Sequence, residues 1–303
     1  MTKFKEEELS DKQFIPLLAV ADYRMEVGMG VTLYSALRNL GKGYGLDIHL
    51  LSGAVGWPAL RKLKKSLRSL NKPFRLSVIP ISDKQFKGFQ SFANTSLFTY
   101  ARFLFPDIFP SLGKVLYIDV DALVLGDLAE LYSIPLDENL LAAALGRGTE
   151  TFDHTWEALI FKDLGLPGDT PYFNAGILVL DLAQWRKEGF ANQCLEYASK
   201  HPGRCMFWDQ TILNTLLVGK FTCLDEKWNQ QFNGPNKSYV RDGILHYCGP
   251  DKPWAYRNGL TKELNELFFE ELERTAWRGW RPRPKISFGE RVVRKVKKTL
   301  FGF

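Results

Sequence analysis

The hydrophobic pattern of the first ~80 residues alternates between short apolar runs and longer segments with helical spacing. The short runs are rich in β-branched residues, as buried strands are. The longer segments space leucines as amphipathic helices do. This order predicts a parallel sheet with helices on its faces. The predicted strands are residues 14–20, 46–51 and 75–79, and the predicted helices are residues 31–40, entered through a loop at Gly28 and Gly30, and residues 59–70, with solvated Lys and Arg.

The next apolar run, residues 115–118, predicts a central strand that leads into acidic residues. Asp119 and Asp121 follow it, and Gly126 marks a turn. Side chains two positions apart share one face of a strand, so both carboxylates can point from the carboxyl end of the sheet, where ligands bind in open α/β folds. Two adjacent carboxylates favour a hard divalent cation. The alternative is turn or cap chemistry, for which Asp is equally suited.

The pattern around and after this strand continues the same architecture. An aromatic segment before it predicts a buried helix, and small residues before a later strand would let a ligand approach the backbone closely. The predicted elements are a helix over residues 95–105 that ends before Pro106, a strand over 140–145, a loop over 146–168 with a short helix around Trp156, a buried strand after Asn174, Ala175 and Gly176, and a helix from residue 207.

Several polar residues fall at predicted strand ends or in apolar surroundings. Asp22 follows the first strand, where a carboxylate can accept donors of a nucleotide or simply cap a helix. Arg102 lies in the aromatic helix and is expected to face a carboxylate or a phosphate, since arginine is almost never buried unpaired. Asp209 and Gln210 begin a helix, where an aspartate can also complement the helix dipole.

His246 ends a short strand that runs into a loop rich in glycine and proline. Gly249 permits close backbone approach there, and Lys252 offers a point charge for a phosphate. A lone histidine is usually structural, so a ligand role is one of two alternatives at this stage. The chain has no G-x-G-x-x-G motif and no P-loop motif, so neither of those nucleotide-binding folds is supported.

Composition narrows the class of protein. The chain has 303 residues, of which 45% are hydrophobic and 24% charged, as in ordinary globular proteins. No apolar run is long enough to span a bilayer, and the charged start of the chain does not resemble a signal peptide. The four cysteines form no C-x-x-C pair. These features predict a reduced, cytoplasmic compartment.

The net charge of +6 is concentrated at the end of the chain. Residues 277–303 contain nine Lys or Arg and one Glu, a local charge of +8, so the rest of the chain carries 6 − 8 = −2. A nucleic-acid partner is therefore not expected. Aromatic residues are interleaved with these cations, and valines recur on one helical face. The segment predicts attachment to an anionic membrane surface, with a disordered basic end as the alternative.

The order of these motifs resembles glycosyltransferase family eight, which consists of retaining, metal-dependent transferases with a GT-A fold and includes bacterial lipooligosaccharide galactosyltransferases and glycogenin. The resemblance covers the chain from about the first strand to Trp254, and the combined order of its motifs is highly specific. The matching stretches are residues 21–23 (Ala-Asp-Tyr), 99–102 (Thr-Tyr-Ala-Arg), 115–121 (Val-Leu-Tyr-Ile-Asp-Val-Asp), 173–177 (Phe-Asn-Ala-Gly-Ile), 209–214 (Asp-Gln-Thr-Ile-Leu-Asn), 224–229 (Leu-Asp-Glu-Lys-Trp-Asn) and 246–254 (His-Tyr-Cys-Gly-Pro-Asp-Lys-Pro-Trp).

The resemblance implies a role for each matching residue. A manganese ion, or magnesium, would sit on the diphosphate of a UDP-sugar, and an imidazole ligand favours manganese. Gln210 would lie below the anomeric carbon, where its amide oxygen could stabilise oxocarbenium character. The implied metal ligands are Asp119, Asp121 and His246; the implied donor-binding residues are Val20, Asp22, Arg24, Arg102, Asp119, Val120, Asn174, Ala175, Gly249 and Lys252; and the implied catalytic residues are Asp209 and Gln210.

The resemblance also implies the reaction and the domain organisation. A hexose would pass from the UDP-sugar to a saccharide acceptor, such as a lipooligosaccharide, lipopolysaccharide or other surface glycan. Because Gln210 is not a carboxylate nucleophile, front-side return of an ion pair is expected. An N-terminal arm (1–12) would precede an α/β catalytic domain of GT-A type (13–275), with a Rossmann-like, mainly parallel central sheet, and a basic amphipathic tail (276–303) would hold the enzyme at the inner face of the cell membrane.

Two departures leave the sugar open between glucose, galactose and another hexose. The bacterial galactosyltransferases have Asn where Arg24 aligns, and an Asp near the loop at residues 145–148, which here has no carboxylate.

Two other functions remain alternatives. A D-x-D phosphohydrolase would have Thr or Val at position 123, where this chain has Leu123, and would begin with the motif. A non-catalytic sugar-nucleotide-binding protein would have less need of leaving-group activation.

Overall fold

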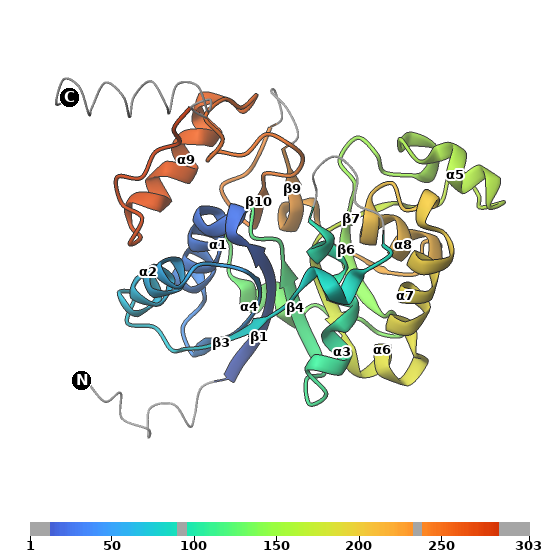
Figure 1. Ribbon diagram of the computed structural model, residues 1–303, viewed down its shortest axis with the longest axis horizontal. Coiled ribbons are helices and arrows are strands. Elements are labelled where there is room, and N and C mark those ends of the chain that lie inside the picture. The colour runs from blue at the N-terminus through green and yellow to red at the C-terminus, as the bar shows by residue number, and fades with distance from the viewer. Residues whose placement is uncertain (1–12, 90–95, 233–237, 285–303) are drawn as a thin grey trace, which may run out of the picture.

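A seven-stranded sheet forms the centre of the computed structural model, which describes residues 13–89, 96–232 and 238–284 (Figure 1). The strand order is β3-β2-β1-β4-β7-β6-β8. Four neighbouring pairs are parallel, whereas β7 runs antiparallel to β4 and β6, so the sheet is mixed but mainly parallel, as predicted. The strands are β1 (Gln13–Asp22), β2 (Tyr44–Gly53), β3 (Phe74–Pro80), β4 (Lys114–Ile118), β6 (Leu141–Leu145), β7 (Phe173–Asp181) and β8 (Thr222–Cys223).

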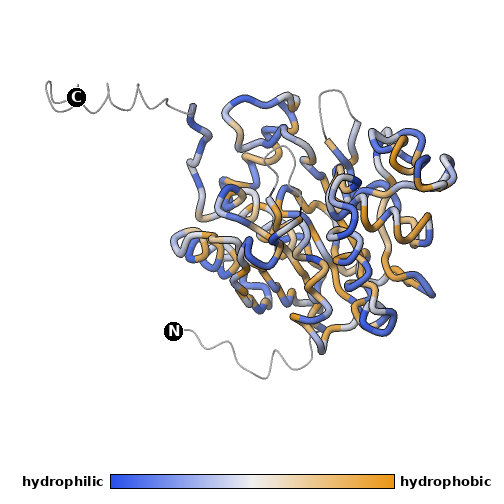
Figure 2. Tube along the Cα trace, turned by 45° about the vertical axis from the view of Figure 1, so that its right-hand side comes forward, coloured by the Kyte–Doolittle hydropathy of each residue, from blue (hydrophilic) through white to orange (hydrophobic). Residues whose placement is uncertain are grey.

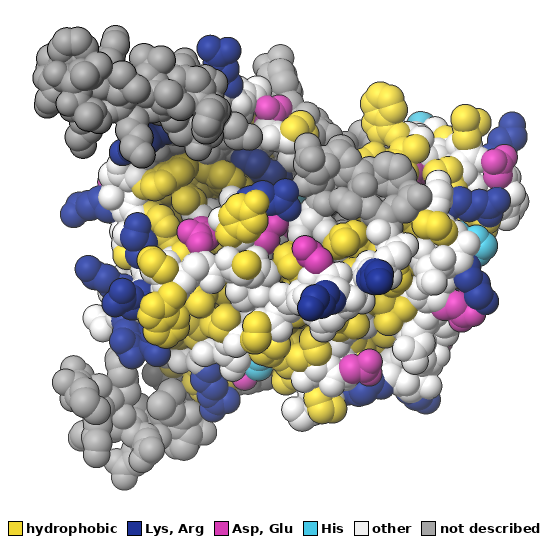
Figure 3. All heavy atoms as spheres, viewed as in Figure 1, with side chains coloured by type: hydrophobic (Ala, Val, Ile, Leu, Met, Phe, Trp, Pro, Cys, Tyr) yellow, Lys and Arg dark blue, Asp and Glu magenta, His cyan; other side chains and the backbone are white. Residues whose placement is uncertain are grey.

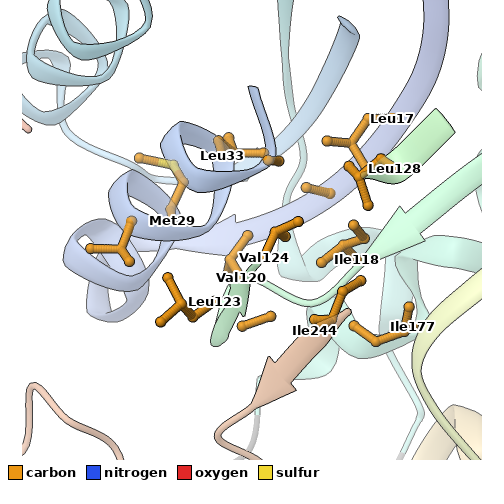
Figure 4. Close-up of a cluster of buried hydrophobic side chains, with 14 of the residues drawn as sticks. Leu17, Met29, Leu33, Ile118, Val120, Leu123, Val124, Leu128, Ile177 and Ile244 are labelled. Carbon is orange, nitrogen blue, oxygen red and sulfur yellow. The ribbon is translucent and has the colours of Figure 1, made fainter. Parts of the chain in front are cut away.

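Alternating side chains of the central strands build two hydrophobic cores, one on each face of the sheet. In β4, Leu116 and Ile118 enter one core, and Val115 and Tyr117 enter the other. Apolar side chains on both faces are expected of strands in an α/β sheet covered on both sides. Figure 2 shows the apolar positions concentrated inside and the polar ones on the outer turns, and Figure 4 shows part of the first core.

Helices cover both faces of the sheet (Figure 1). On one side α1 packs against β1, α2 and α9, and on the other α6 packs against β4 and α8 against β7. In the described part of the chain, no helix is long and apolar enough to cross a membrane. The α-helices are α1 (Glu26–Asn39), α2 (Trp57–Arg68), α3 (Phe105–Ile108), α4 (Leu128–Ser133), α5 (Ala158–Asp163), α6 (Leu182–Glu188), α7 (Phe190–Lys200), α8 (Trp208–Leu217) and α9 (Lys262–Glu273).

Short 3-10 helices join several of these elements. The aromatic segment before β4 is such a helix, and it matters most because it holds Arg102. The 3-10 helices are η2 (Tyr23–Met25), η3 (Asp83–Phe86), η4 (Leu97–Leu104), η5 (Phe152–His154), η6 (Pro202–Arg204) and η7 (Glu226–Asn229).

A second, three-stranded sheet carries the predicted histidine to the central strand. Its order is β5-β10-β9, formed by β5 (Ala122–Val124), β10 (Ile244–His246) and β9 (Gln230–Gln231). β10 runs antiparallel to β5, and His246 pairs with Ala122, the residue after Asp121. The backbone amide of Tyr247 donates to the carbonyl of Asp121 at 2.9 Å. This pairing joins segments more than 120 residues apart in sequence.

The structure corrects the prediction of a loop at Gly28 and Gly30, because both glycines lie inside α1. They serve close packing instead. A Cβ on Gly28 would lie 2.5 Å from the Trp254 ring, and one on Gly30 would lie 2.5 Å from the Trp277 ring. Trp277 is only 4% exposed and belongs to the first core, so it does not share the membrane role predicted for residues 277–303.

The bounds of two predicted helices differ from the structure. The aromatic segment does not end before Pro106, because α3 continues the helical path through that residue, and a proline is tolerated in a first turn. The short helix predicted around Trp156 is α5, which begins two residues later, and Trp156 itself lies between η5 and α5 with 83% of its surface exposed. The predicted arm at residues 1–12 and the end of the predicted tail, 285–303, lie outside the described residues.

Candidate active site

Asp119, Asp121 and His246 meet at the carboxyl edge of the central sheet. β4 ends at Ile118, and the amide of Asp119 donates to the carbonyl of Gly176 at 2.7 Å, which fixes the turn that follows. The His246 Nε2 atom lies 3.3 Å from Asp121 Oδ1 and 3.8 Å from Asp119 Oδ2. One ligand atom from each residue lies within 4.8 Å of the others. The three predicted ligands therefore converge.

The surroundings of this cluster fit a divalent cation. Asp121 Oδ1 is buried and has no hydrogen-bond partner among the described residues, and such a buried, unsatisfied oxygen is costly unless something binds it. Gly176 leaves room beside the cluster, since a Cβ there would overlap the His246 ring and lie 2.9 Å from Asp119 Oδ2. Two carboxylates and an imidazole suit Mn²⁺, with Mg²⁺ as the harder alternative.

Lys252 supplies the balancing positive charge. Its Nζ lies 2.5 Å from Asp121 Oδ2 and donates to the carbonyl of Tyr247 at 2.5 Å. Burial alone would raise the pKa of Asp121, but Lys252 and His246 hold that pKa well below its usual range. Burial raises the pKa of Asp119, with Arg102 opposing it. The two carboxyls of the motif thus differ in character, and Asp121 is the more firmly ionised.

Arg102 is the buried cation that the aromatic segment predicted, and it does face carboxylates. Its guanidinium lies 2.9 Å from Asp209 and 3.5 Å from Asp119, and it donates to the carbonyl of Ala175 at 2.5 Å. Thr99 and Tyr117 donate to Asp209 and Asp119, respectively. Burial outweighs the ion pair with Arg102 and raises the pKa of Asp209 to about 6. Arg102 thus connects α8 to the Asp-x-Asp turn.

Gln210 lies at the start of α8 with its side-chain orientation fixed by a backbone amide. Ala175 N–H can only donate, and it lies 3.0 Å from Gln210 Oε1, so this atom is the amide oxygen. The Asn174 side-chain amide donates to the same oxygen at 3.0 Å. Gln210 Nε2 therefore points the other way and donates to the Tyr172 hydroxyl at 2.8 Å. The oxygen assigned to the anomeric carbon already accepts two hydrogen bonds.

A second backbone amide sets the tautomer of His246. Gly176 N–H donates to Asn174 Oδ1, which also accepts from Asn229 Nδ2 at 2.8 Å. The other end of the Asn229 amide is consequently an oxygen, 2.9 Å from His246 Nδ1. His246 therefore donates from Nδ1, so Nε2, which faces the two aspartates, is the ring nitrogen that would bind a cation. Asn229 therefore orients the His246 ring of the candidate cation site.

The remaining predicted donor-binding residues lie around this edge with less direct connections. β1 is parallel to β4, so Val20 and Asp22 reach the same edge as Asp119. Asp22 caps η2 and forms an ion pair with Arg24 at 2.7 Å. Val120 is buried within the Asp-x-Asp turn, and Gly249 has a φ of +76°, which favours glycine, after β10. Direct contact of these residues with a nucleotide stays a prediction.

Sequence reasoning assigned no role to Tyr172, Asn229 or Glu157. Asn229 closes one of the stretches that match the family, and Tyr172 directly precedes another, so position in the motifs could have singled both out. Glu157 lies between η5 and α5, and nothing in its sequence neighbourhood distinguishes it from a surface residue. It is nevertheless 0% exposed.

The mainly parallel sheet, the Asp-x-Asp turn at its carboxyl edge and the histidine from a second sheet are features of α/β glycosyltransferases of GT-A type. The profile described as Glycosyl transferase family 8 matches residues 15–258, and the chain belongs to this family. It is accordingly a glycosyltransferase, and enzymes that transfer hexoses are among its relatives.

Known proteins of this kind are similar over most of the chain. The lipopolysaccharide 1,3-galactosyltransferase of Salmonella typhimurium is 32% identical over 216 residues, 67% of this chain and 62% of that protein. The lipopolysaccharide glucosyltransferase WaaO of Escherichia coli is 26% identical over 269 residues, 83% and 75% of the two chains. The crystal structure of the galactosyltransferase LgtC with donor and acceptor sugar analogues superimposes with a TM-score of 0.73 at 23% identity, covering 91% of this chain and all of LgtC, a likeness that establishes the fold.

Proposed function

We propose that this enzyme transfers a hexose, galactose or glucose, from a UDP-sugar to a saccharide acceptor with retention of the anomeric configuration. The observation that carries the proposal is the convergence of Asp119, Asp121 and His246, with Lys252 beside them, in a chain of this family. The proposed acceptor is a lipooligosaccharide, a lipopolysaccharide or another surface glycan, because two relatives are named as lipopolysaccharide glycosyltransferases. This acceptor can be linked to a lipid.

In this proposal each residue has a defined task toward the donor. A bound Mn²⁺ or Mg²⁺ held by Asp119, Asp121 and His246 would supply Lewis-acid stabilisation of the charge on the departing diphosphate. Lys252 and the backbone at Gly249 would hold the phosphates, and Asp22 would accept from the uracil. Arg102, Asn174, Ala175 and Asp209 would surround the sugar. Val20, Arg24 and Val120 would complete the nucleotide pocket.

Retention is proposed to proceed by front-side return. The bond between the anomeric carbon and the UDP oxygen breaks, the acceptor oxygen bonds to the same face of the carbon, and the acceptor proton passes to the departing phosphate. Gln210 Oε1, already polarised by two donors, is a poor nucleophile and serves through its negative dipole. Mass-spectrometric trapping of a covalent glycosyl-enzyme would overturn this mechanism.

Attachment to the inner face of the cell membrane is part of the proposal and rests on charge. The helix α2 contains five Lys or Arg and no acidic residue, all five cations are exposed, and Trp57 at its start is 70% exposed. The last described segment leaves the domain beside α2, where the amide of Ala276 donates to Ser66. Figure 3 shows Lys and Arg gathered at the edge of the molecule on the side of α2.

A donor screen tests the proposal against its two alternatives. UDP-glucose, UDP-galactose and related donors are added with Mn²⁺, and the melting temperature and UDP release are measured. We expect one UDP-hexose to raise the melting temperature and to be hydrolysed slowly, only with the cation. A phosphohydrolase would instead cleave simple phosphate esters, and a non-catalytic sugar-nucleotide-binding protein would be stabilised without releasing UDP.

A further inference from the structure

Glu157 is a fully buried carboxylate whose side chain does not serve its own helix. It occupies the N-cap position of α5 but makes no side-chain cap hydrogen bond. Its carboxyl oxygens accept from the hydroxyls of Tyr172, at 2.7 Å, and of Thr211, and the backbone amide of Phe207 also favours the ionised form. In the described part of the chain it forms no ion pair. Burial raises its pKa. A buried carboxyl without a cation is costly, so a purely local structural role does not explain it.

Both hydroxyls connect Glu157 to α8, the helix of Asp209 and Gln210: Thr211 lies on this helix, and Tyr172 contacts Gln210. Tyr172, 2% exposed, accepts a hydrogen bond from Gln210 Nε2 at 2.8 Å. A phenolic hydroxyl has one hydrogen, so while it accepts from Gln210 it directs that hydrogen to Glu157. A strong acceptor behind Tyr172 therefore keeps the hydroxyl oxygen turned toward the amide of Gln210.

We propose that Glu157 is a positioning residue that orients the Gln210 side chain through Tyr172. Every hydrogen bond along this path points toward the carboxylate, and the backbone amide of Ala175 sets the same direction from the opposite end. With the acceptor removed, the Tyr172 hydroxyl can turn and donate to another group. The Gln210 amide then loses its partner and its fixed orientation. The inference rests on the proposed function, because it assigns the purpose of the path to Gln210.

The test compares variants by the kcat and KM of Mn²⁺-supported UDP-sugar hydrolysis, with melting temperature as the check on folding. Glu157→Met keeps the size of the side chain but removes the acceptor, and we expect kcat to fall about 10- to 100-fold with KM within about threefold. Tyr172→Phe should lower kcat similarly. Glu157→Gln retains an acceptor oxygen and should recover most of the activity. Glu271→Gln, which alters a buried carboxylate of α9, is the control and should leave kcat unchanged.

Combining each change with Gln210→Ala separates the positioning role of Glu157 from the catalytic role of Gln210. If Glu157 acts through Gln210, then Glu157→Met in the Gln210→Ala background lowers kcat no further. The positioning role would be overturned if the two changes lowered kcat independently, so that their fold losses multiplied in the double variant. A folded Glu157→Met enzyme with wild-type kcat would overturn it too. Both results would leave the proposed function intact. Full activity of Gln210→Ala would instead overturn the catalytic assignment itself. Should Glu157→Met fail to fold, the same comparison with Tyr172→Phe decides the matter.

Discussion

Lys252 lies 2.5 Å from Asp121, against the carboxylate oxygen that does not face His246. The ammonium therefore neutralises an aspartate that is proposed to bind a cation, and it stands where a diphosphate would arrive. A lysine that only supported Asp121 would strengthen cation binding, whereas a phosphate-binding lysine would oppose it by charge repulsion and strengthen nucleotide binding instead. The two roles make opposite predictions.

Replacing Lys252 by Met distinguishes them. We expect Mn²⁺ to bind the free variant as tightly as the wild type or more tightly, while UDP binding with Mn²⁺ present weakens about 10- to 100-fold through loss of a charged contact. Isothermal titration calorimetry measures both affinities. Lys262→Met, at an exposed position of α9, is the matched control. Loss of Mn²⁺ binding in the Lys252 variant would show that the lysine mainly holds Asp121 in place.

Much of this site could be predicted from the sequence because each ligand sits at the end of a strand. The runs before Asp119 and at residues 14–20 predicted β4 and β1, and the short strand before His246 was also predicted. Parallel strands bring their carboxyl ends to one edge, which predicted that Asp119 lies beside Asp22 there. His246 comes from a second sheet, and only the family resemblance assigned it as a third ligand.

The other contacts depend on tertiary packing that no local pattern records. Gly28 and Gly30 suggested a loop, yet both lie in α1. Glycine is needed there because indole rings from distant segments pack against the helix at these positions. Glu157 looked like a surface residue because its burial depends on Tyr172 and Thr211, both elsewhere in the sequence. Trp277 looked like part of a membrane-binding tail until its place in the core was known.

The Asp209 carboxyl gives a prediction for stability against pH. Its pKa of about 6 lies above the ~3.9 of an unfolded aspartate, so the folded chain holds this proton more tightly. The stability gained from that proton is full below pH ~4 and is lost as the pH rises through about 6. Asp209→Asn mimics the protonated form, so we expect it to stabilise the fold at pH 7.5, by at most ~3 kcal/mol, and progressively less toward pH 4.5.

Thermal unfolding of the wild type and Asp209→Asn across this pH range measures the difference. The variant should lose transferase activity at every pH, because Arg102 and the donor sugar lose their charged partner. If the variant melts below the wild type at pH 7.5, the ion pair with Arg102 outweighs the cost of burying the carboxylate.

Gly176 provides a steric test of the cation cluster. A methyl group there would overlap the His246 ring and approach Asp119, so Gly176→Ala should displace one ligand and weaken Mn²⁺ binding about 10-fold or more. Overpacking should cost ~1–3 kcal/mol of folding free energy. Gly113→Ala, whose new methyl would meet no atom within 4 Å, is the control. Wild-type Mn²⁺ affinity in a folded Gly176→Ala variant would place the cation elsewhere.

Charge reversal on α2 tests the proposed membrane contact. Each cation near an anionic leaflet contributes ~1 kcal/mol, so Arg61→Glu with Lys65→Glu should reduce binding to phosphatidylglycerol vesicles at least ~10-fold, as should deletion of residues 285–303. Hydrolysis of the UDP-sugar in solution should be unaffected by the α2 changes. The control reverses Lys162 and Lys187, which are exposed on α5 and α6. Unchanged sedimentation with vesicles for both the α2 variant and the deletion would refute the membrane proposal.

The central claim is that Asp119, Asp121 and His246 hold a cation on which UDP-sugar cleavage depends. Its most direct measurement is UDP release from UDP-galactose and UDP-glucose by the wild type and Asp121→Ala, each with Mn²⁺ and with a chelator. We predict that the wild type releases UDP with Mn²⁺ but not with the chelator. The rate of UDP release by Asp121→Ala should be at least ~100-fold lower, while its circular dichroism spectrum matches that of the wild type. Equal turnover by folded Asp121→Ala, or by the wild type with the chelator, would contradict the account.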